Sequence, residues 1–178
     1  MEHTLESVFW PRSNSFIKQA SLVLLGVIVL AAASQLRIPL QPVPLTFQSA
    51  TVILIGMAYG SRYSAAVIAT YLLIGILGVP VFAGTSFFGP TGGYLMGFFP
   101  AAILSGYLAE RGWSKNFITS FIAACFSASI IFLLGIIVLS QFVGWQKAIT
   151  LGVMPFIFSE TIKLLAVSMM VPKMWKKS

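Results

Sequence analysis

Two ionisable side chains lie within an apolar stretch near the C-terminus, PFIFSETIKLLAVSMM, which runs from Pro155 to Met170. Glu160 and Lys163 are three residues apart, so they share one face of a helix. An ionisable residue in a membrane span is costly to insert and usually faces a cavity or the bundle interior. We therefore expect this pair either to anchor the polar groups of a ligand or to form an ion pair that locks its helix to a neighbour.

Neutral hydrogen-bonding side chains lie at the expected outer ends of two other helices. Thr46 and Gln48 precede or begin one apolar segment, and Thr91 and Tyr94 lie at the start of another. Phe82 and its aromatic neighbours supply an apolar wall nearby. A pocket lined by apolar side chains with a few polar groups is typical of a site for a small, largely apolar ligand with defined polar ends.

Two connections carry proline or glycine and almost no charge, unlike ordinary solvent-exposed loops. They are IPLQPVPLTFQ and VPVFAGTSFFGPTGG. Gly84, Gly92 and Gly93 allow the second one to turn tightly and approach a ligand closely. These connections are expected to cover a site, or else to dip into the membrane interface.

Composition argues against enzymatic chemistry. The chain has one cysteine and one histidine, Cys125 and His3. It has no nucleophile–base set, no metal-ligand cluster and no GxxxxGK[ST] loop. We predict no catalytic site, no metal and no cofactor, so any ATP-driven step would need another subunit.

The solvent of this chain is predicted to be membrane lipid. Of 178 residues, 58% are hydrophobic and 8% are charged, whereas soluble domains carry about 25% charged residues. Apolar segments long enough to approach a membrane span number six, and they predict an all-α polytopic bundle of six transmembrane helices: Phe16–Gln35, Phe47–Tyr59, Tyr63–Gly78, Gly92–Leu108, Phe117–Phe142 and Gly152–Val171.

Basic residues set the predicted orientation. Eight of the eleven lie on one side of the membrane and two, Arg37 and Lys147, on the other. The positive-inside rule places both termini in the cytoplasm. Cations in short gaps between spans also argue against nucleic-acid binding. The chain is predicted to be one membrane domain, with a cytoplasmic tail at 1–15, a bundle at 16–172 and a basic cytoplasmic tail at 173–178.

Four stretches together resemble the BioY-type biotin transporters, the substrate-binding S components of energy-coupling factor (ECF) uptake systems. The stretches are IPLQPVPLTFQ, YLLIGILGVPVFAG, GPTGGYLMGF and MPFIFSETIKLLA. The resemblance implies biotin uptake across a bacterial cytoplasmic membrane, a pocket near the outer face, a transmembrane T subunit and two cytoplasmic ATPase subunits. With it goes a set of expected biotin-binding residues. Glu160 would be an acceptor and Lys163 a donor, Thr46, Gln48, Thr91 and Tyr94 would complete the polar contacts or hold the connections, Phe82 would cover the bicycle, and Gly84, Gly92 and Gly93 would let their connection approach the ligand.

The sequence departs from the family pattern in two places. Ser159 and Glu160 replace the usual Gly-Asp before Lys163, which keeps the charge and adds one methylene. The first helix also lacks an Ala-x-x-x-Ala pair. Three alternatives stay open: an S component for another small vitamin or a biotin precursor, a structural membrane subunit without a ligand, and an intramembrane enzyme.

Overall fold

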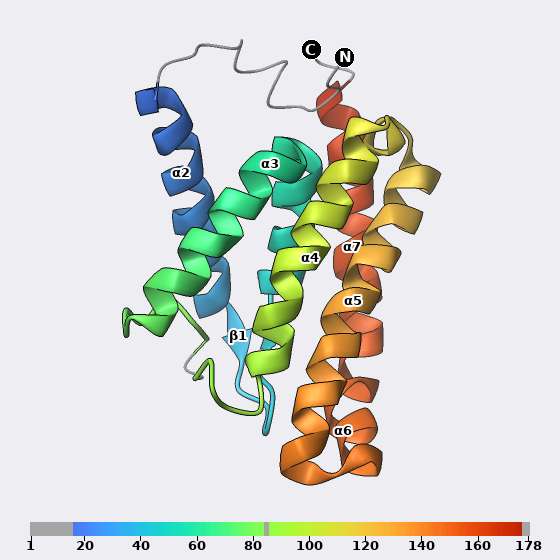
Figure 1. Ribbon diagram of the computed structural model, residues 1–178. Helices are drawn as coiled ribbons and strands as arrows, with labels where there is room; N and C mark the ends of the chain where they lie inside the picture. The colour runs from blue at the N-terminus through green and yellow to red at the C-terminus, as the bar shows by residue number, and fades with distance from the viewer. Residues whose placement is uncertain (1–15, 84–85, 176–178) are drawn as a thin grey trace.

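The computed structural model describes residues 16–83 and 86–175, and these residues are mostly helical (Figure 1). The predicted helical class is thus confirmed, with one pair of two-residue strands added. Residues 1–15, 176–178 and Gly84 lie outside the described residues, so the predicted N-terminal tail and most of the C-terminal tail do too. The elements in chain order are α2 (Phe16–Gln35), β1 (Arg37–Ile38), β2 (Leu45–Thr46), α3 (Gln48–Ile76), α4 (Gly92–Glu110), η1 (Trp113–Lys115), α5 (Phe117–Val143), α6 (Trp145–Gly152) and α7 (Met154–Trp175).

Four helical stretches are long and apolar enough to cross a membrane. They are Gln48–Ile76, Gly92–Glu110, Phe117–Val143 and Trp145–Met174, and Gln19–Gln35 is a shorter apolar helix. The first predicted segment has the bounds of α2, and the last three correspond to α4, α5 and α7. The second and third predicted segments both fall within α3. The short helix α6 precedes α7 and was not predicted.

Helix α3 bends sharply at Gly60, whose φ of 78° and ψ of 174° are not helical. A positive φ favours glycine because it has no Cβ to clash with the backbone. Glu110 holds the bend: its Oε1 accepts hydrogen bonds from the Ser61 amide at 2.6 Å and the Ser61 hydroxyl at 2.8 Å. Gly106 of α4 packs against this bend, and a Cβ added to it would lie 2.4 Å from the Ser61 backbone nitrogen. The bend divides α3 into arms over 48–59 and 61–76.

Small residues allow α3 and α4 to pack backbone to backbone. A Cβ on Gly56 would lie 1.9 Å from the Ser105 hydroxyl and 2.7 Å from the Ala102 carbonyl oxygen. Without a hydrophobic force between helices in lipid, such close approach is a main source of helix association. Gly56 therefore lies at a close contact between α3 and α4.

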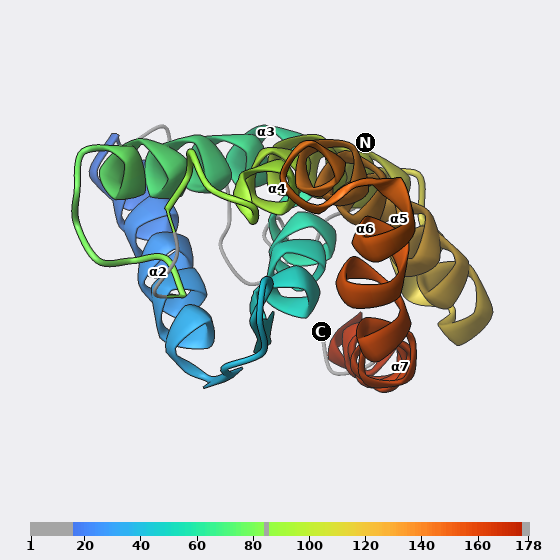
Figure 2. The ribbon, with the colours of Figure 1, turned by 90° about the horizontal axis from the view of Figure 1, so that it is seen from below.

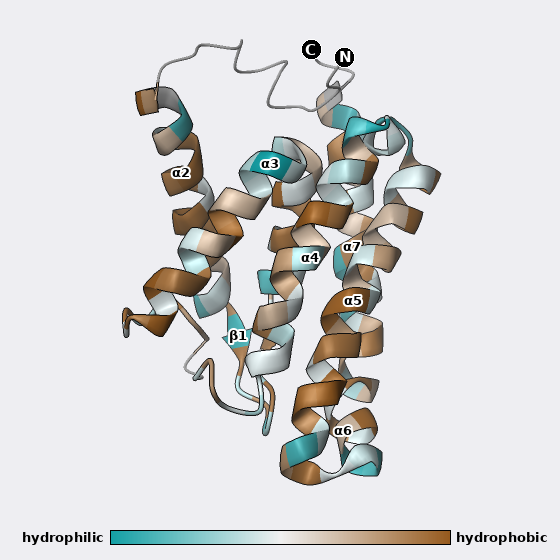
Figure 3. Ribbon diagram, in the orientation of Figure 1, coloured by the Kyte–Doolittle hydropathy of each residue, from teal (hydrophilic) through white to brown (hydrophobic). Residues whose placement is uncertain are grey.

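The helices place their connections at two opposite ends of the molecule. Figure 1 shows the start of α2, the bend of α3, the α4–α5 connection and the end of α7 at one end, and the β1–β2 pair and the α5–α6 turn at the other. Viewed from that second end, the first arm of α3 lies between α2, α4 and α7 (Figure 2). Apolar residues recur along all the helices (Figure 3), and large side chains such as Phe126, Leu133 and Phe158 are exposed, as lipid-facing residues would be.

Candidate functional site

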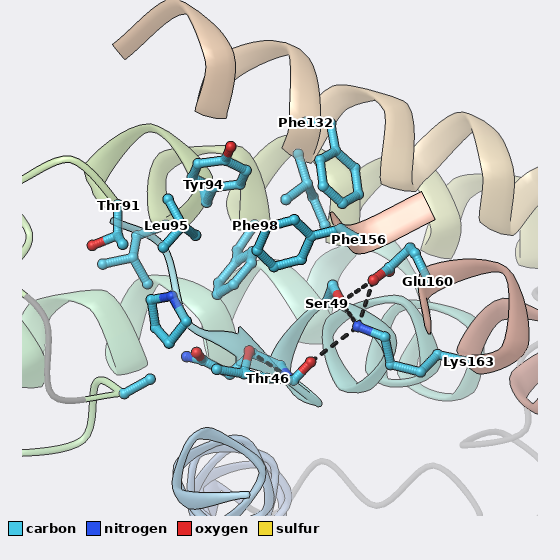
Figure 4. A pocket seen from close by; sticks show the side chains of 15 residues that line it. Thr46, Ser49, Thr91, Tyr94, Leu95, Phe98, Phe132, Phe156, Glu160 and Lys163 are labelled. Atoms are coloured by element: carbon cyan, nitrogen blue, oxygen red, sulfur yellow. Dashed lines mark hydrogen bonds and ion pairs between the residues drawn. The ribbon is translucent and has the colours of Figure 1, made fainter. Parts of the chain in front are cut away.

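The two charged side chains of α7 lie inside the bundle, where they meet residues of two other elements. Lys163 Nζ lies 2.5 Å from Glu160 Oε2 and donates to the Ser49 hydroxyl at 2.9 Å and to the Thr46 carbonyl at 3.0 Å. The Ser49 hydroxyl in turn donates to Glu160 Oε2 at 2.9 Å. Figure 4 shows this network between the β1–β2 pair, the start of α3 and α7. Both charged side chains are 7% exposed.

The local fold explains why these groups converge. β1 and β2 pair antiparallel, with Arg37 opposite Thr46, and this directs the Thr46 carbonyl toward α7. Ser49 lies in the first turn of α3, one residue after Gln48. An ammonium group has three protons to donate, and the three contacts of Lys163 use them. A ligand that binds Lys163 must therefore replace one of these contacts.

One oxygen of the site lacks a partner. Among the described residues, Glu160 Oε1 is a buried side-chain oxygen with no hydrogen bond. Leaving a buried polar group unsatisfied costs about 1–3 kcal/mol, and more when the group is charged. Glu160 also lines a cavity. The site thus presents an unpaired acceptor where a ligand could donate a hydrogen bond.

The cavity beside this pair is mostly apolar (Figure 4). It has a volume of about 50 Å³, and its walls come from the β1–β2 segment, α3, the 77–91 connection, α4, α5 and α7. Small-molecule pockets typically have about 300–1,000 Å³, so a ligand of that size must push the walls apart. The lining residues are Val43, Pro44, Thr46, Gln48, Ser49, Ala83, Thr91, Tyr94, Leu95, Phe98, Ile131, Phe132, Phe156, Glu160 and Lys163.

Six of the ten sequence-predicted site residues line this one cavity: Thr46, Gln48, Thr91, Tyr94, Glu160 and Lys163. Two of them also hold the surrounding helices in place. Gln48 Nε2 donates to the Tyr71 hydroxyl at 2.6 Å, which joins the two arms of α3. The Tyr94 hydroxyl donates to the Gly152 carbonyl at 2.8 Å, which joins α4 to the end of α6. These side chains therefore shape the cavity as well as lining it.

The other predicted residues lie elsewhere or outside the described chain. The ring of Phe82 packs on Gly75, where a Cβ would lie 2.1 Å from it, and it meets Tyr71 edge-on at 5.4 Å. A Cβ on Gly92 would meet the Phe87 carbonyl oxygen at 2.1 Å, and one on Gly93 would meet the Leu134 carbonyl oxygen at 2.3 Å. Phe82 thus anchors its connection, Gly92 allows the approach to α4, and Gly93 allows α4 to pack on α5.

Sequence reasoning missed Ser49 and most of the apolar wall. Helical spacing could have found part of it: Phe156 lies four residues before Glu160, and Phe98 lies four after Tyr94, so each pair shares a helix face. Phe132 had no such signal, because none of the ten predicted site residues lies on α5. Phe132 contacts Phe156 with ring centroids 6.0 Å apart, and this contact depends on how α5 and α7 pack.

The sequence model described as the BioY family matches residues 3–178. A probable biotin transporter of Pyrococcus horikoshii is 38% identical over 82% of this chain and 89% of its own length. A biotin transporter of Thermotoga maritima is 35% identical over 83% and 90%. A crystal structure described as the S-component for biotin from an ECF-type ABC transporter superposes with a TM-score of 0.82 over 94% of this chain and 95% of that one, at 22% identity, and this likeness concerns the fold.

Proposed function

The chain belongs to the BioY family, and we propose that it is a biotin transporter that binds biotin in the cavity beside Glu160 and Lys163. Two relatives that the chain matches over about nine-tenths of their length are named as a probable biotin transporter and a biotin transporter. A transporter rather than an enzyme agrees with the lack of a nucleophile–base set in the sequence. The observation that carries the site assignment is that Glu160, whose buried Oε1 has no hydrogen-bond partner, lines a mostly apolar cavity.

Biotin has chemistry that matches this wall. Its ureido ring offers two N–H donors and one carbonyl acceptor, its bicycle and chain are apolar, and it ends in a carboxylate. A carboxylate would be repelled by Glu160, whereas a ureido N–H can donate to Glu160 Oε1. We therefore place the ureido ring at the Glu160 end. The ureido oxygen would replace one of the three acceptors now held by Lys163.

The apolar part of the ligand would contact the aromatic wall. Phe98, Phe132 and Phe156 come from three different helices and line the same cavity. Aromatic side chains bury large apolar areas, which suits the thioether ring and the chain. Since the cavity is about 50 Å³, binding requires movement. Val43, Pro44 and Ala83 lie in connections rather than in helices. We expect these parts of the cavity wall to move when biotin binds.

The membrane arrangement follows from the same proposal. The two arms of α3 would act as separate membrane helices, which gives six spans with α2, α4, α5 and α7. Arg62 follows the bend of α3, Arg111 and Lys115 lie between α4 and α5, and Lys173 is in the last turn of α7. Figure 1 shows these parts at one end of the molecule. By the positive-inside rule this end faces the cytoplasm, together with both termini. Residues 1–178 then form one multi-pass domain of the cytoplasmic membrane, with its cavity nearer the outer face.

Energy for uptake would come from other subunits. The sequence has no phosphate-binding GxxxxGK[ST] loop. An S component of an ECF system would meet a transmembrane T subunit and two cytoplasmic ATPase subunits. We propose the same set of partners here.

The test is uptake of radiolabelled biotin by cells that can neither make nor import biotin, with and without this chain. We expect uptake to depend on the chain and to be reduced at least tenfold at subsaturating biotin by Glu160→Gln, since hydrogen bonds to charged groups contribute about 1.5–3 kcal/mol. Unlabelled biotin should compete, and unrelated vitamins should not. Uptake blocked better by desthiobiotin or another vitamin than by biotin would reassign the substrate.

A further inference from the structure

A short chain of hydrogen bonds leads away from the proposed biotin cavity and joins α2, both arms of α3 and the 77–91 connection. The Val81 carbonyl oxygen accepts from the Tyr71 hydroxyl at 2.8 Å and from the Ser34 hydroxyl at 2.7 Å. The Tyr71 hydroxyl accepts in turn from Gln48 Nε2 at 2.6 Å. Ser34, Gln48 and Tyr71 are buried, so water competes little for these bonds. We call these four residues the Tyr71 network.

The protons of the Tyr71 network can be assigned from its acceptors. A tyrosine hydroxyl carries one proton and a backbone carbonyl can only accept, so Tyr71 donates its proton to Val81. The hydroxyl oxygen is then left as an acceptor, and the NH₂ end of the Gln48 amide satisfies it. The Gln48 amide therefore has a defined orientation, with Nε2 toward Tyr71.

Gln48 connects the Tyr71 network to the cavity, because it is one of the lining residues. A glutamine amide has two N–H protons and a carbonyl oxygen. In the described part of the chain, the Gln48 side chain makes one hydrogen bond, to Tyr71, which leaves the second proton and the oxygen for a ligand. A flipped amide would exchange the donor and the acceptor that a ligand meets.

Tyr71 is itself held by packing and lies behind the cavity wall. Its side chain is fully buried, and its ring meets the Phe82 ring edge-on with centroids 5.4 Å apart. Phe82 is fixed in turn against Gly75. Among the described residues that line the cavity, Tyr71 is not found. An effect of its hydroxyl on a ligand must therefore pass through another residue.

We propose that Tyr71 is a positioning residue for biotin binding, an inference that rests on the biotin site proposed above. Its hydroxyl holds the Gln48 amide in one orientation before the ligand arrives. A polar group that is already ordered costs less to fix on binding, and this raises affinity. Gln48 and Tyr71 lie on opposite arms of α3, so the bend of this helix brings the two side chains together.

The test is the Kd of the purified full-length chain for radiolabelled biotin in detergent, with the melting temperature measured on the same samples. Tyr71→Phe keeps the ring and its contact with Phe82 and removes only the hydroxyl. The usual net contribution of one hydrogen bond corresponds to about 2- to 12-fold in Kd, and we expect an increase of that size. The matched control is Ser34→Ala, which removes the other hydroxyl from the Val81 carbonyl and leaves Gln48 paired with Tyr71. It should leave the Kd unchanged.

A second variant separates positioning from a general effect on the fold. Gln48→Met removes the amide and keeps an apolar side chain of similar length. In this background Tyr71→Phe should leave the Kd unchanged, because no amide remains to be oriented. An effect on the fold alone would raise the Kd by the same factor in both backgrounds.

Four results would overturn the positioning role of Tyr71 while biotin still binds the wild type. They are an unchanged Kd in Tyr71→Phe, an equal increase in Ser34→Ala, an equal effect of Tyr71→Phe in both backgrounds, and a Tyr71→Phe chain that does not fold. The last would show that the hydroxyl is needed for the fold rather than for binding. A folded wild-type chain that binds no biotin would instead overturn the proposed function, and this inference with it.

Discussion

The substitution Lys163→Met removes the ammonium group and keeps most of the apolar stem. Three contacts of Lys163 are lost at once, to Glu160 at 2.5 Å, Ser49 at 2.9 Å and Thr46 at 3.0 Å. Glu160 then retains the Ser49 hydroxyl alone. Because the side chain of Glu160 is 7% exposed, water does little to replace the missing cation.

The expected cost follows from the burial of the pair. Removing one partner of a buried ion pair typically costs about 3–5 kcal/mol, because the remaining charge is buried and unpaired. We expect Lys163→Met to lower the free energy of unfolding by that amount. The double variant Lys163→Met with Glu160→Gln removes both charges and should recover most of the loss.

Biotin binding should behave differently from stability. If Glu160 and Lys163 bind the ureido ring, loss of charge-assisted hydrogen bonds of about 1.5–3 kcal/mol raises the Kd about 10- to 150-fold. The double variant should therefore regain stability without regaining affinity. This split separates a binding pair from an ion pair that only locks the helices.

The assay combines unfolding of the detergent-solubilised chain with equilibrium binding of radiolabelled biotin. Thr161→Ala serves as the control. Thr161 is an exposed residue of the same helix, and its hydroxyl donates to the Ile157 carbonyl one turn earlier. It should change neither quantity. A double variant that recovers both stability and affinity would refute the binding role, and a Lys163→Met protein as stable as the wild type would refute the electrostatic argument.

Three further substitutions test the surroundings of the site. Gly75→Ala puts a methyl where the Phe82 ring lies 2.1 Å away, so we expect a loss of about 1–3 kcal/mol from overpacking, seen as a lower melting temperature. Tyr94→Phe removes the 2.8 Å bond to the Gly152 carbonyl and should cost about 0.5–1.5 kcal/mol in the same assay. Glu110→Gln weakens the two bonds that hold the α3 bend, and about 1.5–3 kcal/mol of stability should be lost. No change in the melting temperature of a variant would show that its contact contributes nothing to stability.

Much of the architecture follows from residue patterns. The bounds of α2 and the apolar segments of α4, α5 and α7 can be predicted from the sequence. In lipid, each long apolar segment must form its backbone hydrogen bonds within itself, and a helix does this. The bend of α3 at Gly60 falls in the gap that the sequence predicted between the segments Phe47–Tyr59 and Tyr63–Gly78, where Arg62 lies. The sequence did not predict that Glu110 would hold the bend. Its contact with Ser61 joins α4 to α3 and depends on how the two helices pack.

The site divides in the same way. Glu160 and Lys163 stand out because charges are rare in a membrane segment. Their partners do not, since the Thr46 contact uses a backbone carbonyl and a serine such as Ser49 is common at a helix start. Phe82 was expected in the binding wall on the strength of its apolar character. Its ring instead packs on Gly75, a contact that no spacing rule relates to the site.

Saturation binding of radiolabelled biotin to the purified wild-type chain in detergent tests the proposed biotin site directly. We expect saturable binding of about one biotin per chain, at the single Glu160 site that we propose, displaced by unlabelled biotin and not by an unrelated vitamin. A folded, monodisperse wild-type chain that shows no saturable biotin binding would contradict it.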